Sequence, residues 1–272
     1  MLMKVSHESP ISILEESKAY NDFDYALVHL FETHPQYKAY FKSAVDVYNR
    51  EVLLDNSIFE LGKAFDSEKY IKEILWLKPN MFIVPDVLEE SRDTINSYKL
   101  WRSDGKLDHI KNTFQTKTIG AIQGKTWQEL ISCYKFMSEN ADMIAISFDF
   151  SYYHITGEGW NPLERFCSGR QRFISQLIER GVWAWNKPHH LLGCSLAKEF
   201  RYYVDNNIYN IVSCDTSNPI VAAIHNMKYD VDYGLQNKPT TKLADLIDYN
   251  FTQEQLELVI YNTTMFKKII RR

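Results

Sequence analysis

The chain has 272 residues, of which 45% are hydrophobic and 24% charged, and its formal net charge is −4. A protein that coats nucleic acid by charge alone is strongly basic, so this balance excludes that class but leaves room for a local basic face. A chain of this length can bury a full core in one barrel, and we expect a single domain over residues 1–272.

The four cysteines are widely separated and form no CxxC pair, which indicates neither a zinc site nor a disulfide framework. We expect reduced, buried thiols. The first residues lack the apolar segment of a signal peptide, and no apolar run approaches the roughly 18 residues of a membrane span. The sequence therefore predicts a soluble, cytoplasmic protein without membrane contacts, located in the host cytoplasm if it is viral.

Short apolar runs alternate with helix-like segments, which is the βαβ pattern of a parallel sheet. We expect eight strands, at residues 2–6, 25–31, 51–55, 81–86, 118–123, 142–149, 189–194 and 208–214. Apolar residues at helical spacing predict helices over 35–47, 66–77, 91–102, 126–139, 162–181, 196–206 and 252–272. Asp66 and Thr252 are expected to cap two of these helices. This order predicts an α/β fold, a single (β/α)8 TIM barrel.

Two stretches lack clean periodicity. Residues 150–161 are typical of an active-site loop, and residues 226–250 of an irregular excursion after the last strand.

Polar residues stand at the exits of four of the expected strands, namely Asp55, Asp86, Gln123 and Asp215. In a parallel barrel the C-terminal strand ends converge on the catalytic face, so we expect one shared constellation. A carboxylate accepts hydrogen bonds from a purine, and a Gln amide both donates and accepts. Taken singly, Asp55 also fits a turn and Asp215 also fits a helix cap.

Two neighbours of these residues are suited to binding a planar ligand. Gly124 follows Gln123 directly, so the backbone there can approach a ligand closely. Phe59 follows Asp55 by four positions and is either a core residue or an aromatic platform for a base.

In their order along the chain, these motifs resemble the tRNA-guanine transglycosylases and their phage DNA-modifying relatives. DNSIFE (55–60) resembles the family's DSGGFQ, VPDV (84–87) lies where the family has its base-reading Asp, and AIQG (121–124) resembles its QG strand end. Further along, KPHHLLGCS (187–195) resembles PRYLMGVG, IYNIVSCD (208–215) resembles DMFDCV, and YNTTMFKKI (261–269) resembles HNIAFYQQL. The resemblance covers most of the chain.

The resemblance implies that Asp215 is the nucleophile and Asp55 the general acid/base of a base exchange. It also implies a base pocket with two reading side chains, two residues that sandwich the base and a glycine that leaves room for it: Asp86 and Gln123, Phe59 and Leu192, and Gly193. The family's GGLAVGE strand end has no counterpart. SFDFSYY (147–153) stands there instead and adds Asp149 as a further candidate for substrate binding.

Other departures bear on the substrate. No cysteine follows Cys214, so the family's zinc module is absent, and its Arg-bearing LPTR is replaced by TSNP (216–219). In both respects the chain is similar to the compact phage-type enzymes, which insert 7-deazaguanine derivatives into DNA. The implied partners are DNA, or alternatively tRNA, and a free 7-deazaguanine base. The implied reaction needs no metal or other cofactor, and the oligomeric state stays open.

Contacts to phosphate need cations, and PLERFCSGRQRF supplies Arg165, Arg170 and Arg172, which also fit a solvated helix face. His189 and His190 stand at a strand start and are interpreted as core or surface histidines. Two other classes stay open: a TIM-barrel glycoside hydrolase that uses two carboxylates, and a non-catalytic barrel that binds nucleobases.

Overall fold

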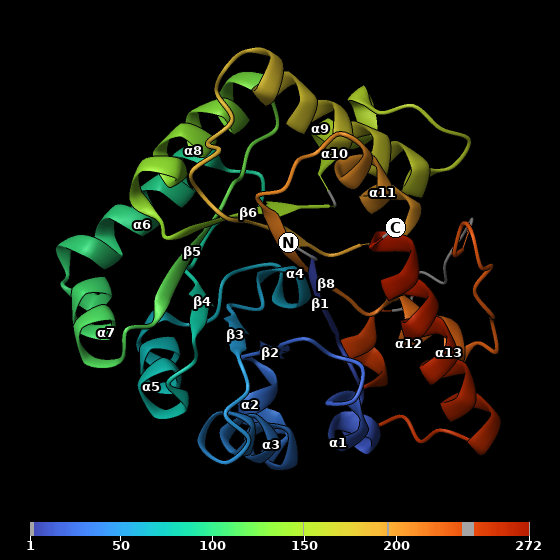
Figure 1. Ribbon diagram of the computed structural model, residues 1–272. Helices are drawn as coiled ribbons and strands as arrows, with labels where there is room; N and C mark the ends of the chain where they lie inside the picture. Colours follow the sequence, from blue (N-terminus) through green and yellow to red (C-terminus); the bar gives the residue numbers. More distant parts are fainter. Residues whose placement is uncertain (1–2, 149, 195, 236–241, 272) are drawn as a thin grey trace. The chain divides into compact units, whose positions relative to one another are not determined.

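The computed structural model describes residues 3–148, 150–194, 196–235 and 242–271 (Figure 1). Within them, the strands are β1 (Lys4–His7), β2 (Asp24–Leu27), β3 (Val52–Asp55), β4 (Met81–Ile83), β5 (Lys117–Ala121), β6 (Met143–Ser147), β7 (His189–Leu192) and β8 (Ile211–Thr216). Each expected strand is present within a few residues, and the strand pairs are parallel. Helices follow the strands in alternation, which confirms the predicted (β/α)8 class.

The helices of the described residues are α1 (Leu14–Ser17), α2 (Leu30–Thr33), α3 (Pro35–Asp46), α4 (Ile58–Leu61), α5 (Ser67–Leu77), α6 (Ser91–Ser103), α7 (Lys106–Phe114), α8 (Trp127–Asn140), α9 (Ser151–Thr156), α10 (Pro162–Glu179), α11 (Lys198–Asp205), α12 (Asn218–Ile224) and α13 (Gln253–Ile270). Short 3-10 helices, η1 (Ile11–Ile13) and η2 (Leu243–Leu246), add to these.

Both predicted helix caps are confirmed. The Asp66 carboxylate accepts the N–H groups of Glu68 and Lys69 at the start of α5. Thr252 and Gln255 form a capping box at the start of α13. These bonds satisfy amide donors that have no partner inside the first helical turn.

The segment 150–161, which lacks a clean period in the sequence, is partly helical. α9 lies inside 150–161 because Tyr153 is buried there and its backbone oxygen accepts the N–H of Gly157. A Cβ on Gly169 of α10 would lie 2.2 Å from the Tyr153 oxygen, so a glycine is needed for α9 and α10 to approach this closely. The segment 150–161 is therefore not a loop throughout, and its place at an active site stays a prediction.

The chain divides into two compact units, residues 23–146 and residues 1–22 together with 147–272. Strands β2 to β6 are neighbours in chain order in the first unit. In the second, β8 lies between β1 and β7. The expectation of one domain over 1–272 stays a prediction.

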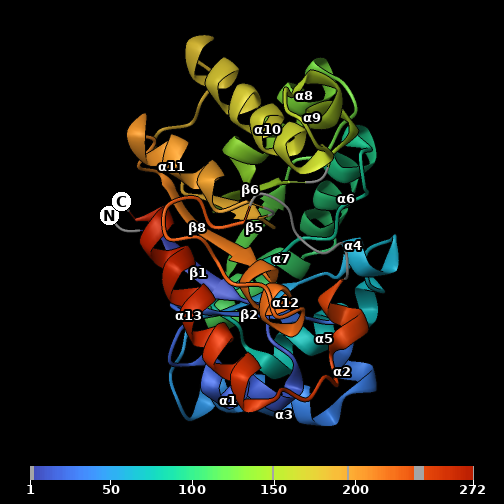
Figure 2. The same ribbon diagram turned by 90° about the vertical axis from the view of Figure 1, so that its right-hand side faces the viewer.

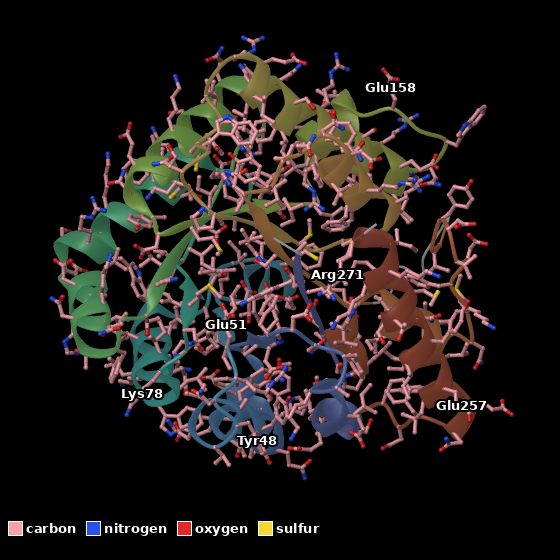
Figure 3. All side chains as sticks on the ribbon, in the orientation of Figure 1. Tyr48, Glu51, Lys78, Glu158, Glu257 and Arg271 are labelled. Atoms are coloured by element: carbon pink, nitrogen blue, oxygen red, sulfur yellow. The ribbon has the colours of Figure 1, made fainter. Side chains whose placement is uncertain are left out.

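In the unit that holds both chain ends, α13 packs against α11 and α12 (Figure 2). Val259 and Phe266 on its inner face are buried, whereas Glu257 points away from the core (Figure 3). An apolar cluster joins α12, α13 and the first turns of the chain through Ile13, Tyr20, Val221, Val259 and their neighbours. This apolar stripe keeps α13 on the unit.

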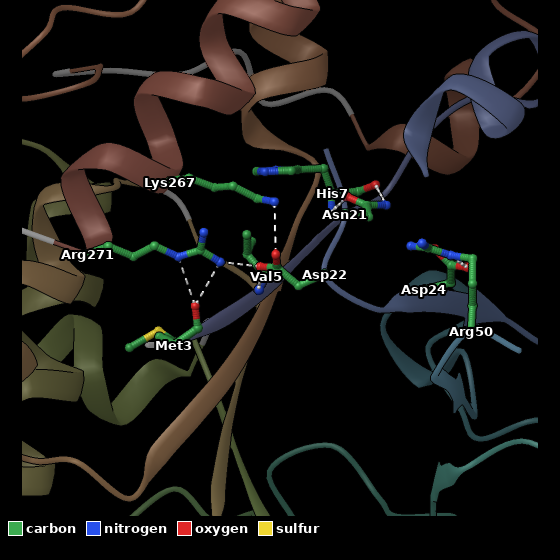
Figure 4. Close-up of polar contacts among 9 residues, drawn as sticks. All are labelled: Met3, Val5, His7, Asn21, Asp22, Asp24, Arg50, Lys267 and Arg271. Atoms are coloured by element: carbon green, nitrogen blue, oxygen red, sulfur yellow. Dashed lines mark hydrogen bonds and ion pairs between the residues drawn. The ribbon is translucent and has the colours of Figure 1, made fainter. Parts of the chain in front are cut away.

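Asp22 ties the first strand to the last helix (Figure 4). Its carboxylate accepts the Val5 N–H at 2.8 Å and the Lys267 ammonium at 3.0 Å, and it also pairs with Arg271. Arg271 further donates to the Met3 carbonyl oxygen at 3.2 Å. One carboxylate thus fixes β1 and α13 together. No helix in the described residues is long and apolar enough to cross a membrane.

Candidate functional site

Asp215 occupies the C-terminal part of β8 in the unit formed by residues 1–22 and 147–272. Asp215 is 4% exposed, and two donors hold its side chain. His190 Nε2 lies 2.9 Å from Oδ1, and the Gly193 N–H is 3.2 Å from each carboxylate oxygen. The alternative that Asp215 caps the next helix is wrong, because the side chain of Thr216 accepts the Asn218 N–H instead.

A hydrogen-bonded row continues from Asp215 into the sheet. His190 Nδ1 lies 2.8 Å from the Ser213 hydroxyl, and all three side chains are buried. A bulge between His189 and His190 pairs His190 with Ser213, whereas His189 pairs with Ile211. The bulge therefore places the imidazole beside two β8 side chains, which share a face because they are two residues apart.

The same residue types form the hydrolytic Ser-His-Asp triad, but the order along the strand differs from what a hydrolase needs. Ser213 precedes Asp215 on β8, so the carboxylate is nearer the C-terminal end, where barrel enzymes carry their chemistry. The row thus favours Asp215 rather than Ser213 as the reacting group.

Arg170 supports the segment that follows β7. Its guanidinium is fully buried and pairs with Glu199, with Nε 2.7 Å from Oε1 and Nη2 2.9 Å from Oε2. It also donates to the carbonyl oxygens of Leu192 and Gly193 at 3.1 Å each. The prediction that Arg170 binds phosphate is therefore wrong, because its guanidinium is buried and already paired with Glu199.

The other two predicted phosphate contacts are exposed. Arg165 donates to the Gly159 carbonyl oxygen at 3.4 Å, and Arg172 donates to the Thr156 carbonyl oxygen at 3.2 Å. Both side chains border the segment between α9 and α10, where Trp160 is fully exposed. Their role at a nucleic-acid surface stays a prediction.

Leu192 and Gly193 form the exit of β7. Leu192 is half-buried, and Gly193 has a φ of +66°, a left-handed conformation that glycine adopts without steric cost. That turn aims the Gly193 N–H at Asp215 while its carbonyl oxygen faces Arg170. Gly193 therefore orients the carboxylate, and the expectation that it leaves room for a base stays a prediction.

In the unit formed by residues 23–146, three strand exits share a second polar row. Asp86 follows β4, and its carboxylate accepts Asn56 Nδ2 at 2.7 Å and Gln123 Nε2 at 2.5 Å. Asn56 follows β3, Gln123 follows β5, and all three side chains are at most 3% exposed. Asp86 and Gln123 were expected to lie together, and their contact confirms it.

The amide of Gln123 has a defined orientation because its Oε1 accepts the Glu89 N–H at 2.7 Å. Nε2 therefore faces Asp86 and retains one further hydrogen for a ligand. Burial raises the pKa of Asp86, and the hydrogen bonds from Asn56 and Gln123 offset part of that rise. The row can present an acceptor and a donor side by side to the edge of a base.

Asp55 is the last residue of β3, and its Oδ2 accepts the Ser57 N–H at 3.0 Å. Ser57 has a φ of +59°, so the turn interpretation of Asp55 is confirmed. The same side chain is 6% exposed at the strand exit, and its acid/base role stays a prediction. Phe59 in α4 is 47% exposed, as an aromatic platform for a ligand would need.

The glycine after Gln123 is explained by packing. A Cβ on Gly124 would lie 2.8 Å from the Leu130 nitrogen and 2.8 Å from the Glu129 Cβ in α8. The close approach at Gly124 is thus to the first turns of a helix, and a ligand is not needed to account for it. Asp149 lies outside the residues that the structure describes.

Two participants were missed at first. No role was predicted for Asn56, although its amide reaches Asp86, and His190 was interpreted only as a core or surface residue. The alternation of Ser213 and Asp215 marks their shared face, but nothing local marks His190 as their neighbour. His189 does fit the core interpretation: it stacks on Trp183 with ring centroids 3.8 Å apart.

The four cysteines are free and buried, as expected. No group of three or more His, Cys, Asp or Glu side chains within the described ranges is arranged to hold a metal ion.

No protein-family model matches the chain, and no curated protein matches it.

Proposed function

We propose that the protein exchanges a base in a polynucleotide, replacing guanine in DNA by a 7-deazaguanine derivative through a covalent glycosyl-enzyme on Asp215. The observation that carries this proposal is the Asp215 carboxylate, which is buried near a strand end and held by Gly193 and His190. A carboxylate with fixed orientation is what attack on a sugar carbon requires. The proposed setting is cytoplasmic.

In the first step, an Asp215 oxygen attacks C1′ of the nucleotide, and the C1′–N9 bond to guanine breaks. Asp55 in its acid form donates a proton to the leaving base. In the second step, the Asp55 carboxylate takes the proton from N9 of the incoming base, which attacks C1′ and releases Asp215. Two inversions give retention, as in glycosidases with a carboxylate nucleophile and a second acid/base carboxylate.

The row of Asp86, Asn56 and Gln123 supports purine recognition. The guanine anion is a poor leaving group unless hydrogen bonds stabilise its negative charge. Groups that bind the edge of guanine therefore also lower the barrier to breaking the C1′–N9 bond. Asp86 supplies acceptors and Gln123 Nε2 supplies a donor, and exposed Phe59 offers a stacking face. A guanine in a duplex must first be extruded, at a cost of about a few kcal/mol.

The test incubates the protein with a radiolabelled 7-deazaguanine and with DNA or tRNA in parallel, and scores label in each polymer. Labelled DNA is expected, together with a protein–DNA adduct that survives denaturation. Asp215→Asn, which keeps the shape of the side chain, should abolish both, whereas Asp205→Asn on the surface of α11 serves as the matched control.

Each of the other possible results would contradict one part of this proposal. Label in tRNA alone would replace DNA as the substrate. Full activity of Asp215→Asn would refute the nucleophile. Tight binding of the base without exchange into either polymer would favour a non-catalytic barrel, and cleavage of a small glycoside would favour a hydrolase.

A further inference from the structure

The two oxygens of Asp215 have different surroundings. Oδ1 receives His190 Nε2 at 2.9 Å and the Gly193 N–H at 3.2 Å, whereas Oδ2 receives only the shared Gly193 N–H, also at 3.2 Å. A carboxylate oxygen has about two lone-pair sites, so these two donors fill Oδ1. Oδ2 keeps an open site, since no second donor from the described part of the chain contacts it.

The proton arrangement of the row follows from what each group can do. An ionised carboxylate only accepts, so the His190 nitrogen that faces Asp215 must carry a hydrogen. A serine hydroxyl both donates and accepts, so Ser213 fits either state of Nδ1 and does not select the tautomer. Asp215 is therefore the group that fixes the proton on Nε2, and Ser213 completes the row.

We propose that His190 and Ser213 are positioning residues for Asp215, holding Oδ1 through the proton on His190 Nε2 and leaving Oδ2 as the attacking oxygen. The identity of the attacked atom rests on the proposed base exchange. The position of the proton does not, because it is a property of the folded protein alone.

The second donor to Asp215 is fixed independently. Gly193 is held from behind by Arg170, whose own charge is paired with Glu199 inside the same unit. The Asp215 carboxylate thus accepts one hydrogen bond from His190 within β7 and one from Gly193, which follows β7. Loss of either donor leaves a buried carboxylate with one hydrogen-bonding group, which favours rotation of the side chain.

The first experiment locates the proton without any substrate. Nitrogen-15 NMR of the histidine rings, with His190 assigned through His190→Gln, distinguishes a ring nitrogen that carries hydrogen from one that does not. We expect Nε2 to carry a hydrogen in the unaltered protein, because it faces the Asp215 carboxylate. In Asp215→Ala, we expect both tautomers, because the Ser213 hydroxyl fits either one. Hydrogen on Nδ1 alone, or an unchanged single tautomer in Asp215→Ala, would overturn the proposal.

The second experiment separates positioning from packing. His190→Leu keeps the bulk of the side chain and loses the donor to Asp215. Because a hydrogen bond to a charged group is lost, we expect kcat to fall roughly 10- to 100-fold, with KM for DNA unchanged. His190→Gln retains an amide donor and should restore most of the rate, and Ser213→Ala should fall between the two. His225→Gln, an exposed histidine at the end of α12, is the control.

Equal losses in His190→Leu and His190→Gln would show that only shape matters, and would overturn the positioning role. If the unaltered protein exchanges no base at all, the proposed function fails, while the tautomer measurement still decides whether the row is arranged as inferred.

Discussion

His7 should make folding stability depend on pH. It is the last residue of β1, it is 1% exposed, and neither ring nitrogen has a hydrogen-bond partner among the described residues. The ring packs edge-on against Phe266, with centroids 5.3 Å apart. Burial lowers the pKa of His7 well below its usual range, and the nearby cations Lys267 and Arg271 lower it further (Figure 4).

The sign follows from where the proton binds. The folded protein keeps His7 neutral, whereas the unfolded chain takes up a proton near the ordinary pKa of about 6.5, so the free energy of unfolding falls on acidification. For a group that stays neutral when folded, moving from about pH 7.5 to about pH 5.5 removes about 1.4 kcal/mol. His189 adds a similar loss, because burial lowers its pKa to about 3.

The assay is urea unfolding of the unaltered protein and of His7→Phe at both pH values. Phe fills the same space and cannot take a proton, so the variant should lose about 1.4 kcal/mol less on acidification. Contributions from His189, and the opposing one from buried Asp86, are common to both proteins and cancel. An identical pH dependence in the two proteins would refute the reasoning, because it would mean that folded His7 takes up its proton as readily as the unfolded chain does.

Three further predictions concern stability. Glu199→Ala leaves the buried Arg170 guanidinium unpaired and should cost about 3–5 kcal/mol, seen as a lower urea midpoint, and an unchanged midpoint would argue against the pair. Asp66→Ala removes the cap of α5 and should cost about 1 kcal/mol in the same assay, with Asp66→Asn as the capping-competent control. Gly169→Ala places a methyl group 2.2 Å from the Tyr153 oxygen, so α9 should become sensitive to proteolysis, and an intact protection pattern would contradict that packing.

The strands were predictable because their signal is local. Runs such as VLLD (52–55) and MIAIS (143–147) are apolar and β-branched, as strands buried on both faces require. The caps Asp66 and Thr252 were predictable for the same reason, since a cap bonds to amides two or three residues away.

Helices with weak or interrupted patterns were missed. α7 buries only Leu107 and Ile110, and it begins after Gly105, whose φ of +71° separates it from α6. α12 follows a segment rich in turn formers and is buried along its whole length, so it has no amphipathic period to detect. In both cases tertiary packing, and not local preference, decides that the segment is helical.

In the candidate site, too, contacts with a local signal were predictable and contacts set by tertiary packing were not. Asp86 and Gln123 were expected together because each stands at the exit of an expected strand. The pairing of His190 with Ser213, 23 positions along the chain, depends on a bulge between His189 and His190, and no local pattern in β7 marks that bulge. Arg170 was misjudged because its partner Glu199 lies on another helix, 29 residues away.

The tie through Asp22 has a consequence for how the chain is made. Asp22 and Lys267 are separated by 245 positions, and β1 pairs with β8, so the first strand meets its partners only near the end of synthesis. At about 5–20 residues per second, β1 waits on the order of ten to forty seconds for β8 to emerge. Residues 23–146 form a contiguous unit that can fold meanwhile, which shortens the loop that β1 must close. The nascent protein thus carries β1 unpaired ahead of a compact unit, and the backbone N–H and C=O groups of this strand are open to pairing with another chain until β8 emerges.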